Sequence, residues 1–197
     1  MSLLLEKKLP VGFVLIYDEK PNFPCRGVKQ VHGKEIAVVI DKNQYTEDKE
    51  ADGLMMVLMN DMPVLSVQTA DCMPIVVLGK RGVALLHAGW RGLQQEIALQ
   101  KNVEVLMPYY FFVGPHINSC CFEVKEDFKK NFPNSPHFSQ RDEKLYFSLI
   151  DEIKDQIKKV YPDAEIESSA ICTCCDQTFH SFRRNGTNKR NWNLLLC

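Results

Sequence analysis

Apolar and polar residues alternate in short blocks along the chain, and the clearest blocks predict a buried β-hairpin. Two apolar runs, Pro74–Leu78 and Val83–Leu86, flank the turn-like segment G-K-R-G at residues 79–82. Uninterrupted apolar runs on both sides of a glycine-rich polar turn are typical of two buried strands. Antiparallel pairing brings Cys72 and His87 to the same edge of the sheet, because Cys72 precedes the first run and His87 ends the second.

Similar patterns predict the other elements. Residues 149–160 carry an apolar stripe with helical spacing, Ser148 and Asp151 form a capping box in front of it, and Pro162 ends it. A weaker periodicity predicts a helix over residues 92–107. Because several strands follow one another directly, we expect mixed sheets covered by helices rather than a repeated βαβ unit. Further strands are predicted at residues 11–17, 36–40, 54–59, 64–68, 109–113 and 165–171, with 54–59 and 64–68 joined across residues 60–63.

Composition narrows the class of partner. A chain of 197 residues that is 45% hydrophobic and 25% charged is typical of one globular domain, here residues 1–197. The net charge of -1 argues against broad binding to nucleic acid or to an anionic membrane. The apolar run near the N-terminus is too short for a signal peptide, and no stretch is long enough to cross a membrane. We therefore expect a cytoplasmic protein with a small-molecule partner, whose eight cysteines are free thiols or metal ligands.

The segment after the second apolar run carries candidate chemistry. A thiol beside an imidazole, as expected for Cys72 and His87, begins either a metal site or a thiol nucleophile. The following A-G-W-R-G at residues 88–92 predicts a sharp strand-to-helix turn, where backbone N–H groups and Arg91 can meet an anion. His32, which precedes a glycine, is by itself more typical of a surface turn. The dinucleotide-binding motif G-x-G-x-x-G and the P-loop are both absent from the sequence, so those nucleotide-binding classes are not favoured.

Five segments in matching order, spanning about residues 28 to 192, resemble a known family. They are Q-V-H-G at 30–33, T-A-D-C-M-P at 69–74, H-A-G-W-R-G at 87–92, G-P-H-I-N-S-C-C-F-E-V at 114–124 and C-T-C-C-D-Q-T-F-H-S-F-R-R-N-G at 172–186. Together they resemble the YfiH-like laccase-domain family, whose members are labelled multicopper polyphenol oxidase or purine nucleoside phosphorylase. The resemblance implies an α+β fold, a layered α/β/β/α sandwich of mixed sheets with helices on the outside, forming a single domain.

The resemblance also implies a metal site. In the family, zinc is bound by the three residues that correspond here to His32, Cys72 and His87. Three nitrogen and sulfur ligands with an open fourth position are the pattern of a catalytic rather than a structural zinc site. Because cysteine and histidine suit copper as well, Zn²⁺ is expected and Cu²⁺ in its place stays open.

The activity implied by the resemblance is purine nucleoside chemistry: phosphorolysis of adenosine, inosine, guanosine and methylthioadenosine, and deamination of adenosine. The partners would be purine nucleosides and phosphate, with monomer and homodimer both open. Candidates for binding phosphate are Arg91, Arg183 and Arg184, whereas Arg190 is more typical of a solvated ion pair. Asp71 is a candidate proton carrier or orienting residue for a zinc ligand, although a turn or capping aspartate explains it equally well.

The remaining cysteines allow several interpretations. Cys25 and Cys197 need no function, because a free cysteine commonly packs as a small hydrophobic residue. A second, structural metal site is one interpretation of the other five, but C-x-C-C without a matching C-x-x-C partner is a weak signal. A position near the first site is another interpretation for two of them, Cys120 and Cys172. The five are Cys120, Cys121, Cys172, Cys174 and Cys175.

This chain departs from the family pattern at both ends. Family members usually begin with a longer segment that carries an arginine, a Gly-Gly pair and an Asn-Leu-Gly loop, whereas only residues 11–22 precede the comparable region here. The usual T-G-R near the C-terminus is replaced by T-N-K-R at residues 187–190. We expect these differences to affect substrate range and rate more than the fold or the metal.

Three other function classes remain open. A copper-binding, laccase-like polyphenol oxidase is disfavoured, because four-copper oxidases use His-x-His pairs and this chain has five histidines and no such pair. A cysteine hydrolase would use Cys72 as nucleophile and His87 as base. A metal-stabilised binding module would hold metal without turnover.

Overall fold

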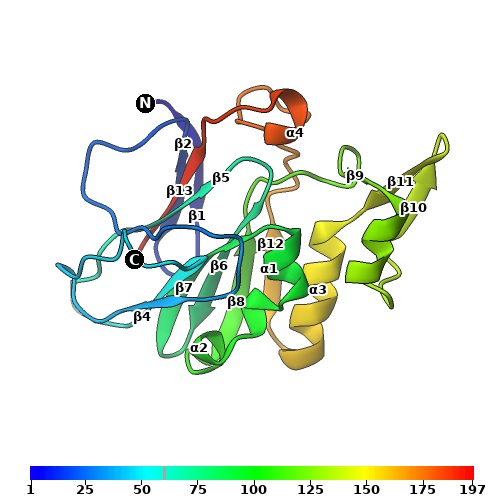
Figure 1. Ribbon diagram of the computed structural model, residues 1–197. Coiled ribbons are helices and arrows are strands. Elements are labelled where there is room, and N and C mark those ends of the chain that lie inside the picture. The colour runs from blue at the N-terminus through cyan, green and yellow to red at the C-terminus, as the bar shows by residue number, and fades with distance from the viewer. Residues whose placement is uncertain (60) are drawn as a thin grey trace.

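The computed structural model describes residues 1–59 and 61–197, with a six-stranded mixed sheet at its centre (Figure 1). In spatial order its strands are β12 (Glu165–Ser168), β8 (Pro108–Val113), β6 (Met73–Gly79), β7 (Gly82–Ala88), β4 (Gly53–Val57) and β3 (Ala37–Val39). The β12–β8 and β4–β3 pairs are parallel and the others are antiparallel. The expected mixed sheet is therefore confirmed.

A second, four-stranded sheet packs on one face of the first. Its order is β1 (Leu3–Lys8), β2 (Phe13–Tyr17), β13 (Asn191–Leu196) and β5 (Leu65–Thr69), and every pair is antiparallel. The C-terminal strand β13 thus lies between two strands from the N-terminal half of the chain. A third, small sheet contains β10 (Phe138–Arg141), β11 (Lys144–Phe147) and β9 (Glu123–Val124). Neither β1, β13 nor the small sheet was predicted.

Most of the helices pack against the opposite face of the central sheet. They are α1 (Trp90–Gln94), η1 (Ile97–Leu99), α2 (Lys101–Glu104), η2 (Glu126–Asn131) and α3 (Leu149–Val160), with α4 (Phe182–Asn185) near the C-terminus (Figure 1). Side chains from the first five pack into the core on this face, whereas the core between the two sheets contains no residue of a described helix. The layers therefore run helices, six-stranded sheet, four-stranded sheet.

Side chains along the central strands alternate strictly between the two cores. In β6, Ile75 and Val77 face the helices, whereas Val76 and Leu78 face the four-stranded sheet. Successive side chains of a strand point to opposite faces, and both faces of β6 and β7 are buried. This explains why the two strands appear in the sequence as uninterrupted apolar runs rather than as alternating ones.

The structure confirms the best-defined local predictions. The hairpin of β6 and β7 is present, and α3 covers residues 149–160 with Ser148 at its N-cap. The Ser148 hydroxyl accepts the Asp151 backbone N–H at 3.3 Å and donates to the Asp151 carboxylate at 2.6 Å. The strands near the predicted positions also form, although β12 ends at Ser168 rather than at residue 171. Within the predicted connection 60–63, residue 60 lies outside the described residues; β4 and β5 on either side of it belong to different sheets.

The predicted helix over residues 92–107 is wrong. Three short helical turns, α1, η1 and α2, replace it. Glu96 adopts the left-handed conformation with φ 55°, and Gln100 is extended with φ -64° and ψ 151°. Because of these two bends, buried residues on either side of them face the same core; examples are Leu93, Ile97 and Val103. In a straight helix with so weak an apolar stripe, these residues would not all face one side. No helix among the described residues has both the length and the apolar character required to cross a membrane.

Candidate active site

The hairpin places Cys72 and His87 at one edge of the central sheet, as the apolar pattern predicted. His87 is the second-last residue of β7 and pairs with Pro74, and Cys72 directly precedes β6. His87 is buried, with 2% of its surface exposed, whereas Cys72 is only partly buried. The imidazole is therefore fixed inside the protein, while the thiol is open on one side.

Asp52, directly before β4, fixes the orientation of His87. The Asp52 carboxylate lies 2.8 Å from Nδ1 of His87, and its backbone carbonyl accepts the His87 N–H at 2.7 Å. Asp52 has no exposed surface. A carboxylate on Nδ1 leaves Nε2 as the ring nitrogen that can bind a metal ion, which is the usual outer-shell arrangement for a histidine ligand.

The same carboxylate holds the loop that carries His32. It accepts the backbone N–H groups of Val31 at 3.3 Å, His32 at 2.8 Å and Gly33 at 2.6 Å. His32 itself has φ 61°, in the left-handed region that non-glycine residues seldom occupy. The three N–H groups converging on one carboxylate account for this conformation, so Asp52 orients two candidate ligands at once.

These contacts bring His32, Cys72 and His87 together. One ligand atom from each lies within 4.8 Å of the others, and the two imidazole rings meet edge to face with centroids 4.8 Å apart. Gly89 borders this space: a Cβ there would lie 3.0 Å from the Cys72 Sγ and 3.5 Å from Cδ2 of His32. Two imidazole nitrogens and one thiolate are a donor set that suits zinc, so the residues present fit that ion.

The electrostatics favour the ionised thiol. Burial opposes ionisation, but hydrogen bonds with His32 and His87 prevail and lower the pKa of Cys72 to about 6. Burial likewise opposes the charge on His87, but hydrogen bonds with Asp52 and Cys72 raise its pKa to about 9. Because the thiolate is the form of cysteine that binds metals and attacks electrophiles, Cys72 suits either role.

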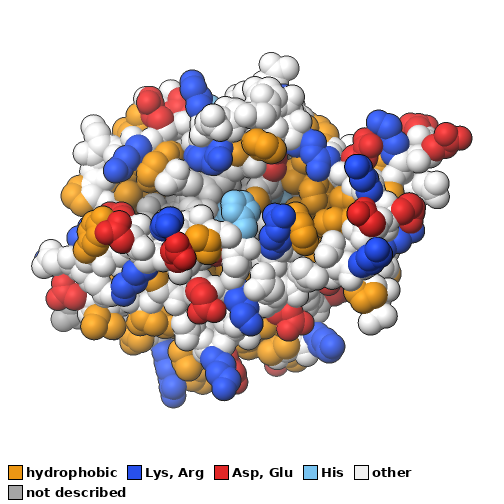
Figure 2. Space-filling model, in the orientation of Figure 1, with side chains coloured by type: hydrophobic (Ala, Val, Ile, Leu, Met, Phe, Trp, Pro, Cys, Tyr) orange, Lys and Arg blue, Asp and Glu red, His pale blue; other side chains and the backbone are white. Residues whose placement is uncertain are grey.

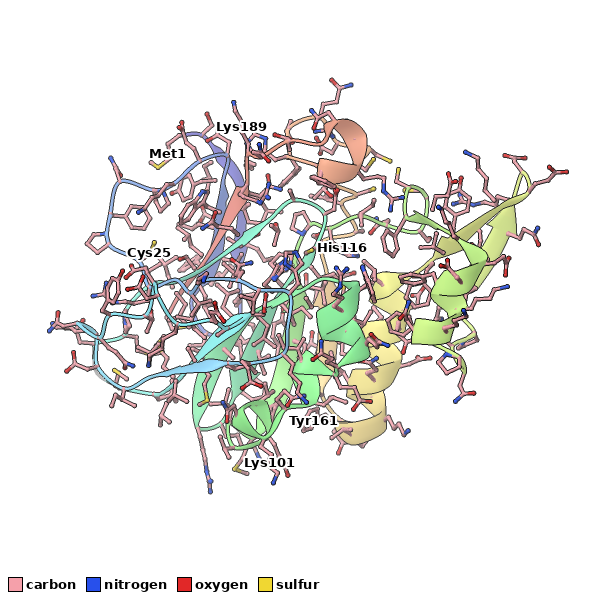
Figure 3. The ribbon with its side chains drawn as sticks, viewed as in Figure 1. Met1, Cys25, Lys101, His116, Tyr161 and Lys189 are labelled. Carbon is pink, nitrogen blue, oxygen red and sulfur yellow. The ribbon has the colours of Figure 1, made fainter. Side chains whose placement is uncertain are left out.

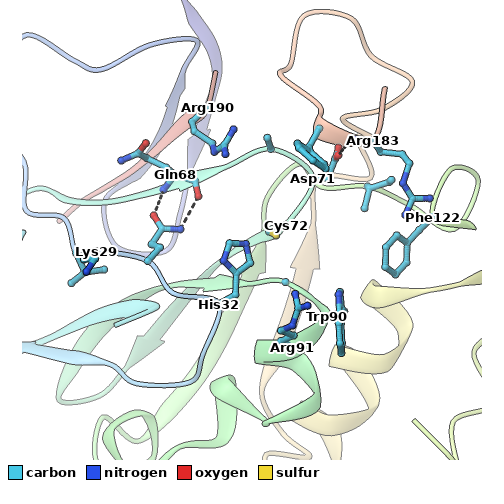
Figure 4. A pocket seen from close by; sticks show the side chains of 16 residues that line it. Lys29, His32, Gln68, Asp71, Cys72, Trp90, Arg91, Phe122, Arg183 and Arg190 are labelled. Carbon is cyan, nitrogen blue, oxygen red and sulfur yellow. Dashed lines mark hydrogen bonds between the residues drawn. The ribbon is translucent and has the colours of Figure 1, made fainter. Parts of the chain in front are cut away.

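A pocket of about 690 Å³ opens over this cluster (Figure 4). Figure 2 shows the hollow from outside, with a histidine side chain exposed at its rim and basic side chains around it. On one wall the Gln30 side chain is hydrogen-bonded to the Gln68 backbone at 2.8 and 2.7 Å. Aromatic side chains that line the pocket are Trp90, Phe122 and Phe182. Its lining thus combines candidate metal ligands with apolar and basic groups.

The three candidate arginines and Arg190 separate into two groups. Arg91, Arg183 and Arg190 line the pocket. Arg190, for which we expected an ion pair, forms none among the described residues and donates to the Thr187 and Lys189 carbonyls instead. Arg91 stacks on Trp90 at 4.4 Å, and within the described residues it forms no ion pair. Arg184 does not line the pocket; its guanidinium donates to the backbone carbonyls of Thr173, Cys174, Asp176 and Phe179.

Asp71 lines the pocket, but its carboxylate is already engaged. One oxygen accepts the Thr173 hydroxyl at 2.7 Å and the other accepts the Arg183 backbone N–H at 2.6 Å. Asp71 is 8% exposed and has φ 90°. It joins the C-terminal segment to the edge of β6, whereas the carboxylate that contacts a candidate zinc ligand is Asp52.

Four of the remaining cysteines form a separate cluster. Ligand atoms of Cys120, Cys121, Cys172 and Cys175 lie within 4.8 Å of one another. Cys120 and Cys172, which we considered as neighbours of the first site, are not among the pocket-lining residues. Cys25, Cys174 and Cys197 belong to neither cluster.

The sequence interpretation missed Asp52 and underestimated this second cluster. Asp52 ends a charged segment that resembles a mobile loop, and the only signal was its position directly before an apolar strand. The cysteine signal was stronger than the C-x-C-C pattern indicated, because Cys172 and Cys175 are themselves a C-x-x-C pair.

Comparisons with known proteins agree with the motifs and the fold. Residues 19–196 match the family model for multi-copper polyphenol oxidoreductase laccase. A purine nucleoside phosphorylase from Aquifex aeolicus is 32% identical over 169 residues, covering 82% of this chain and 77% of that protein. Adenosine deaminase RL5, from an unknown prokaryotic organism, is 27% identical over 183 residues, covering 81% of this chain and 70% of that protein.

A solved structure supports the same assignment. The crystal structure of the Bacillus licheniformis hypothetical protein YfiH superposes with a TM-score of 0.74 at 25% identity, covering 87% of this chain and 73% of that chain. The chain therefore belongs to the multi-copper polyphenol oxidoreductase laccase family, and the YfiH-like resemblance of its motifs is confirmed.

Proposed function

We propose that this protein is a zinc-dependent purine nucleoside phosphorylase that acts on adenosine, inosine, guanosine and methylthioadenosine, and that it also deaminates adenosine. The observation that carries the proposal is the cluster of His32, Cys72 and His87, two of whose members, His32 and Cys72, line a pocket that is also lined by basic and aromatic side chains. Relatives named as purine nucleoside phosphorylase and adenosine deaminase support this choice of substrates.

His32, Cys72 and His87 would hold the zinc ion, with Asp52 fixing the ring of His87 and the loop of His32. When bound, zinc supplies a Lewis acid that operates at neutral pH. Copper in place of zinc would use the same three ligands, so metal analysis of the purified protein decides between them.

Arg91 and Arg183 are the proposed phosphate-binding residues. Both line the pocket, and a guanidinium presents paired N–H donors that match the geometry of phosphate oxygens. Their task in phosphorolysis is to hold the phosphate dianion against the anomeric carbon of the nucleoside. The Arg183 guanidinium donates through Nη1 to the Cys121 and Glu123 carbonyls at 3.2 and 2.9 Å, but it lines the pocket. We leave Arg184 out of this group, because it does not line the pocket and its guanidinium donors are directed to four backbone carbonyls.

The aromatic side chains of the pocket would bind the purine. Trp90 and Phe122 are partly or largely buried, and Phe182 is 61% exposed at the pocket margin. An aromatic face gives a flat base both dispersion contact and a fixed plane. In this proposal Asp71 holds the Arg183 backbone through its carboxylate rather than carrying the proton to the departing purine.

The lowered pKa of Cys72 favours one competing function, a cysteine hydrolase in which Cys72 attacks and His87 is the base. The two proposals differ in their need for metal. A metal-bound thiolate is not free to attack, so a hydrolase would gain activity when zinc is removed, whereas the phosphorylase would lose it.

The test is chromatography of adenosine and inosine incubated with purified, metal-analysed protein, with and without phosphate, beside Cys72→Ala. We expect phosphate-dependent release of adenine and hypoxanthine and phosphate-independent formation of inosine from adenosine, both absent in Cys72→Ala. Unchanged nucleosides with zinc-loaded, folded protein would overturn the proposal. Cys197→Ala is the matched control, because Cys197 belongs to neither cysteine-containing cluster.

A further inference from the structure

The four-cysteine cluster joins two segments that are far apart in the sequence. Cys120 and Cys121 follow β8, and Cys172 and Cys175 follow β12. A β-bridge between His116, labelled near the centre of Figure 3, and Cys172 fixes the two segments side by side, and the Thr173 N–H donates to the His116 carbonyl at 2.9 Å. The central sheet therefore positions both pairs of thiols, since β8 and β12 are adjacent parallel strands.

The sulfur atoms have the spacing of metal ligands. The Sγ atoms lie 3.7 Å apart in Cys120 and Cys121, 3.6 Å in Cys120 and Cys175, and 3.3 Å in Cys121 and Cys175. A tetrahedron with zinc–sulfur bonds of about 2.3 Å has sulfur atoms about 3.8 Å apart, whereas a disulfide requires about 2.05 Å. The observed distances lie close to the first value and far from the second.

Backbone turns present both pairs of thiols. In the C-x-x-C segment, the N–H groups of Cys175 and Asp176 donate to the Cys172 carbonyl at 3.1 and 2.9 Å. The Asn118 N–H donates to the Cys172 Sγ at 3.4 Å. A thiol that accepts a backbone N–H is better suited to the thiolate form, which is the form that binds metal.

Basic side chains surround the cluster, as a site of four thiolates requires. Four thiolates and one divalent cation carry a net charge of about -2. Arg183 donates to the Cys121 carbonyl at 3.2 Å, Arg184 to the Cys174 carbonyl at 3.2 Å and Arg141 to the Ser119 carbonyl at 2.5 Å. Three guanidinium groups are thus bonded to the segments that carry the thiols, where they offset that charge.

We propose that Cys120, Cys121, Cys172 and Cys175 bind one zinc ion in a closed structural site, separate from the His32, Cys72 and His87 cluster. With four protein ligands, no position is open to substrate. The ion would cross-link the segments after β8 and β12, and the segment after β8 also carries Ile117 and Phe122 into the pocket wall. Its role is to hold that wall in place rather than to take part in chemistry.

Metal content and cobalt spectra of the purified protein test the proposal. We expect about two zinc ions per chain in the wild type and about one in either Cys72→Ser or Cys175→Ser, with Cys197→Ser unchanged. Cobalt-loaded Cys72→Ser should retain strong sulfur-to-cobalt absorption, because only the four-cysteine site can then supply thiolates. This arm does not depend on whether Cys175→Ser folds.

Two results would overturn the four-thiolate site. One is a cobalt-loaded Cys72→Ser protein without thiolate absorption. The other is a disulfide within the cluster, in protein purified under reducing conditions and without reductant in the final step. It would lower the intact mass by two hydrogens, and peptide mapping would locate it. Neither result bears on nucleoside turnover, so the site can fail while the proposed function stands.

Discussion

The two cysteine-containing clusters use similar ligands in different ways. His32, Cys72 and His87 come from three separate places in the chain. His32 and Cys72 line a pocket, and Asp52 orients the two histidines. Cys120, Cys121, Cys172 and Cys175 come from two turns and none of the four lines that pocket. Three ligands with an open position suit chemistry, whereas four suit cross-linking. If both proposals hold, ligand number and access, rather than the presence of cysteine, separate a reactive centre from a structural one here.

The largest expected contrast is between His32→Asn and Cys120→Ser. Asparagine tolerates the left-handed conformation of residue 32 but is a poor zinc ligand, so we expect phosphorolysis to fall more than about 100-fold with little change in melting temperature. Cys120→Ser should do the reverse, lowering the melting temperature while activity stays within about 10-fold. Nucleoside assays and thermal unfolding on the same preparations measure both. Equal effects of the two variants on activity would remove the distinction between the clusters.

Asp52→Asn should weaken only the first cluster. An amide cannot accept from three backbone N–H groups and the imidazole as a carboxylate does, so zinc affinity should fall about 10–100-fold and stability by about 1–3 kcal/mol. Competition with a zinc chelator and urea unfolding provide the two readouts. Asp48→Asn is the control, because the Asp48 carboxylate accepts only the Tyr45 hydroxyl among the described residues. Wild-type zinc affinity in Asp52→Asn would contradict the orienting role.

The adjacent arginines distinguish the clusters further. Arg184→Ala removes donors to four backbone carbonyls around the C-x-x-C turn, and we expect a loss of about 1–3 kcal/mol together with weaker zinc binding by the four cysteines. Arg183→Ala removes donors to two backbone carbonyls, those of Cys121 and Glu123, so we expect a smaller loss of stability, and its main expected effect is a higher KM for phosphate. Urea unfolding and phosphate titrations separate the two. An unchanged KM for phosphate in Arg183→Ala would argue against Arg183 as a phosphate ligand.

The smallest expected effect is that of Gly89→Ala. The backbone of Gly89 has φ -76°, which alanine adopts freely, so the only cost is a new Cβ 3.0 Å from the Cys72 Sγ. We expect zinc affinity at the first cluster to fall roughly fivefold, or about 1 kcal/mol, with the four-cysteine site unchanged. Chelator competition measures this, with Gly27→Ala as the control because its new Cβ would approach only the Ser66 hydroxyl closely. Tighter zinc binding would show that the space over Cys72 is not filled by the ion.

Local sequence patterns predicted the elements that form because of interactions between residues close in the sequence. The β6–β7 hairpin follows from two apolar runs around a glycine-rich turn, and α3 follows from a capping box, one apolar stripe and a proline. The region of residues 92–107 failed because its stripe was weak, and packing against the core broke it at Glu96 and Gln100. Strand β13 was missed because its pairing partners, β2 and β5, lie far away in the sequence.

The sequence by itself determined the hairpin, helix α3 and the family, and it supplied the candidate residues for binding metal or phosphate, because each depends on residue type and short-range spacing. Only the tertiary structure decided how those residues combine. The buried carboxylate of Asp52 contacts an imidazole 35 residues away, and the sulfur atoms of Cys121 and Cys175 meet across 54 residues. Such contacts arise from strand order in the sheets, and no local pattern encodes which strands become neighbours.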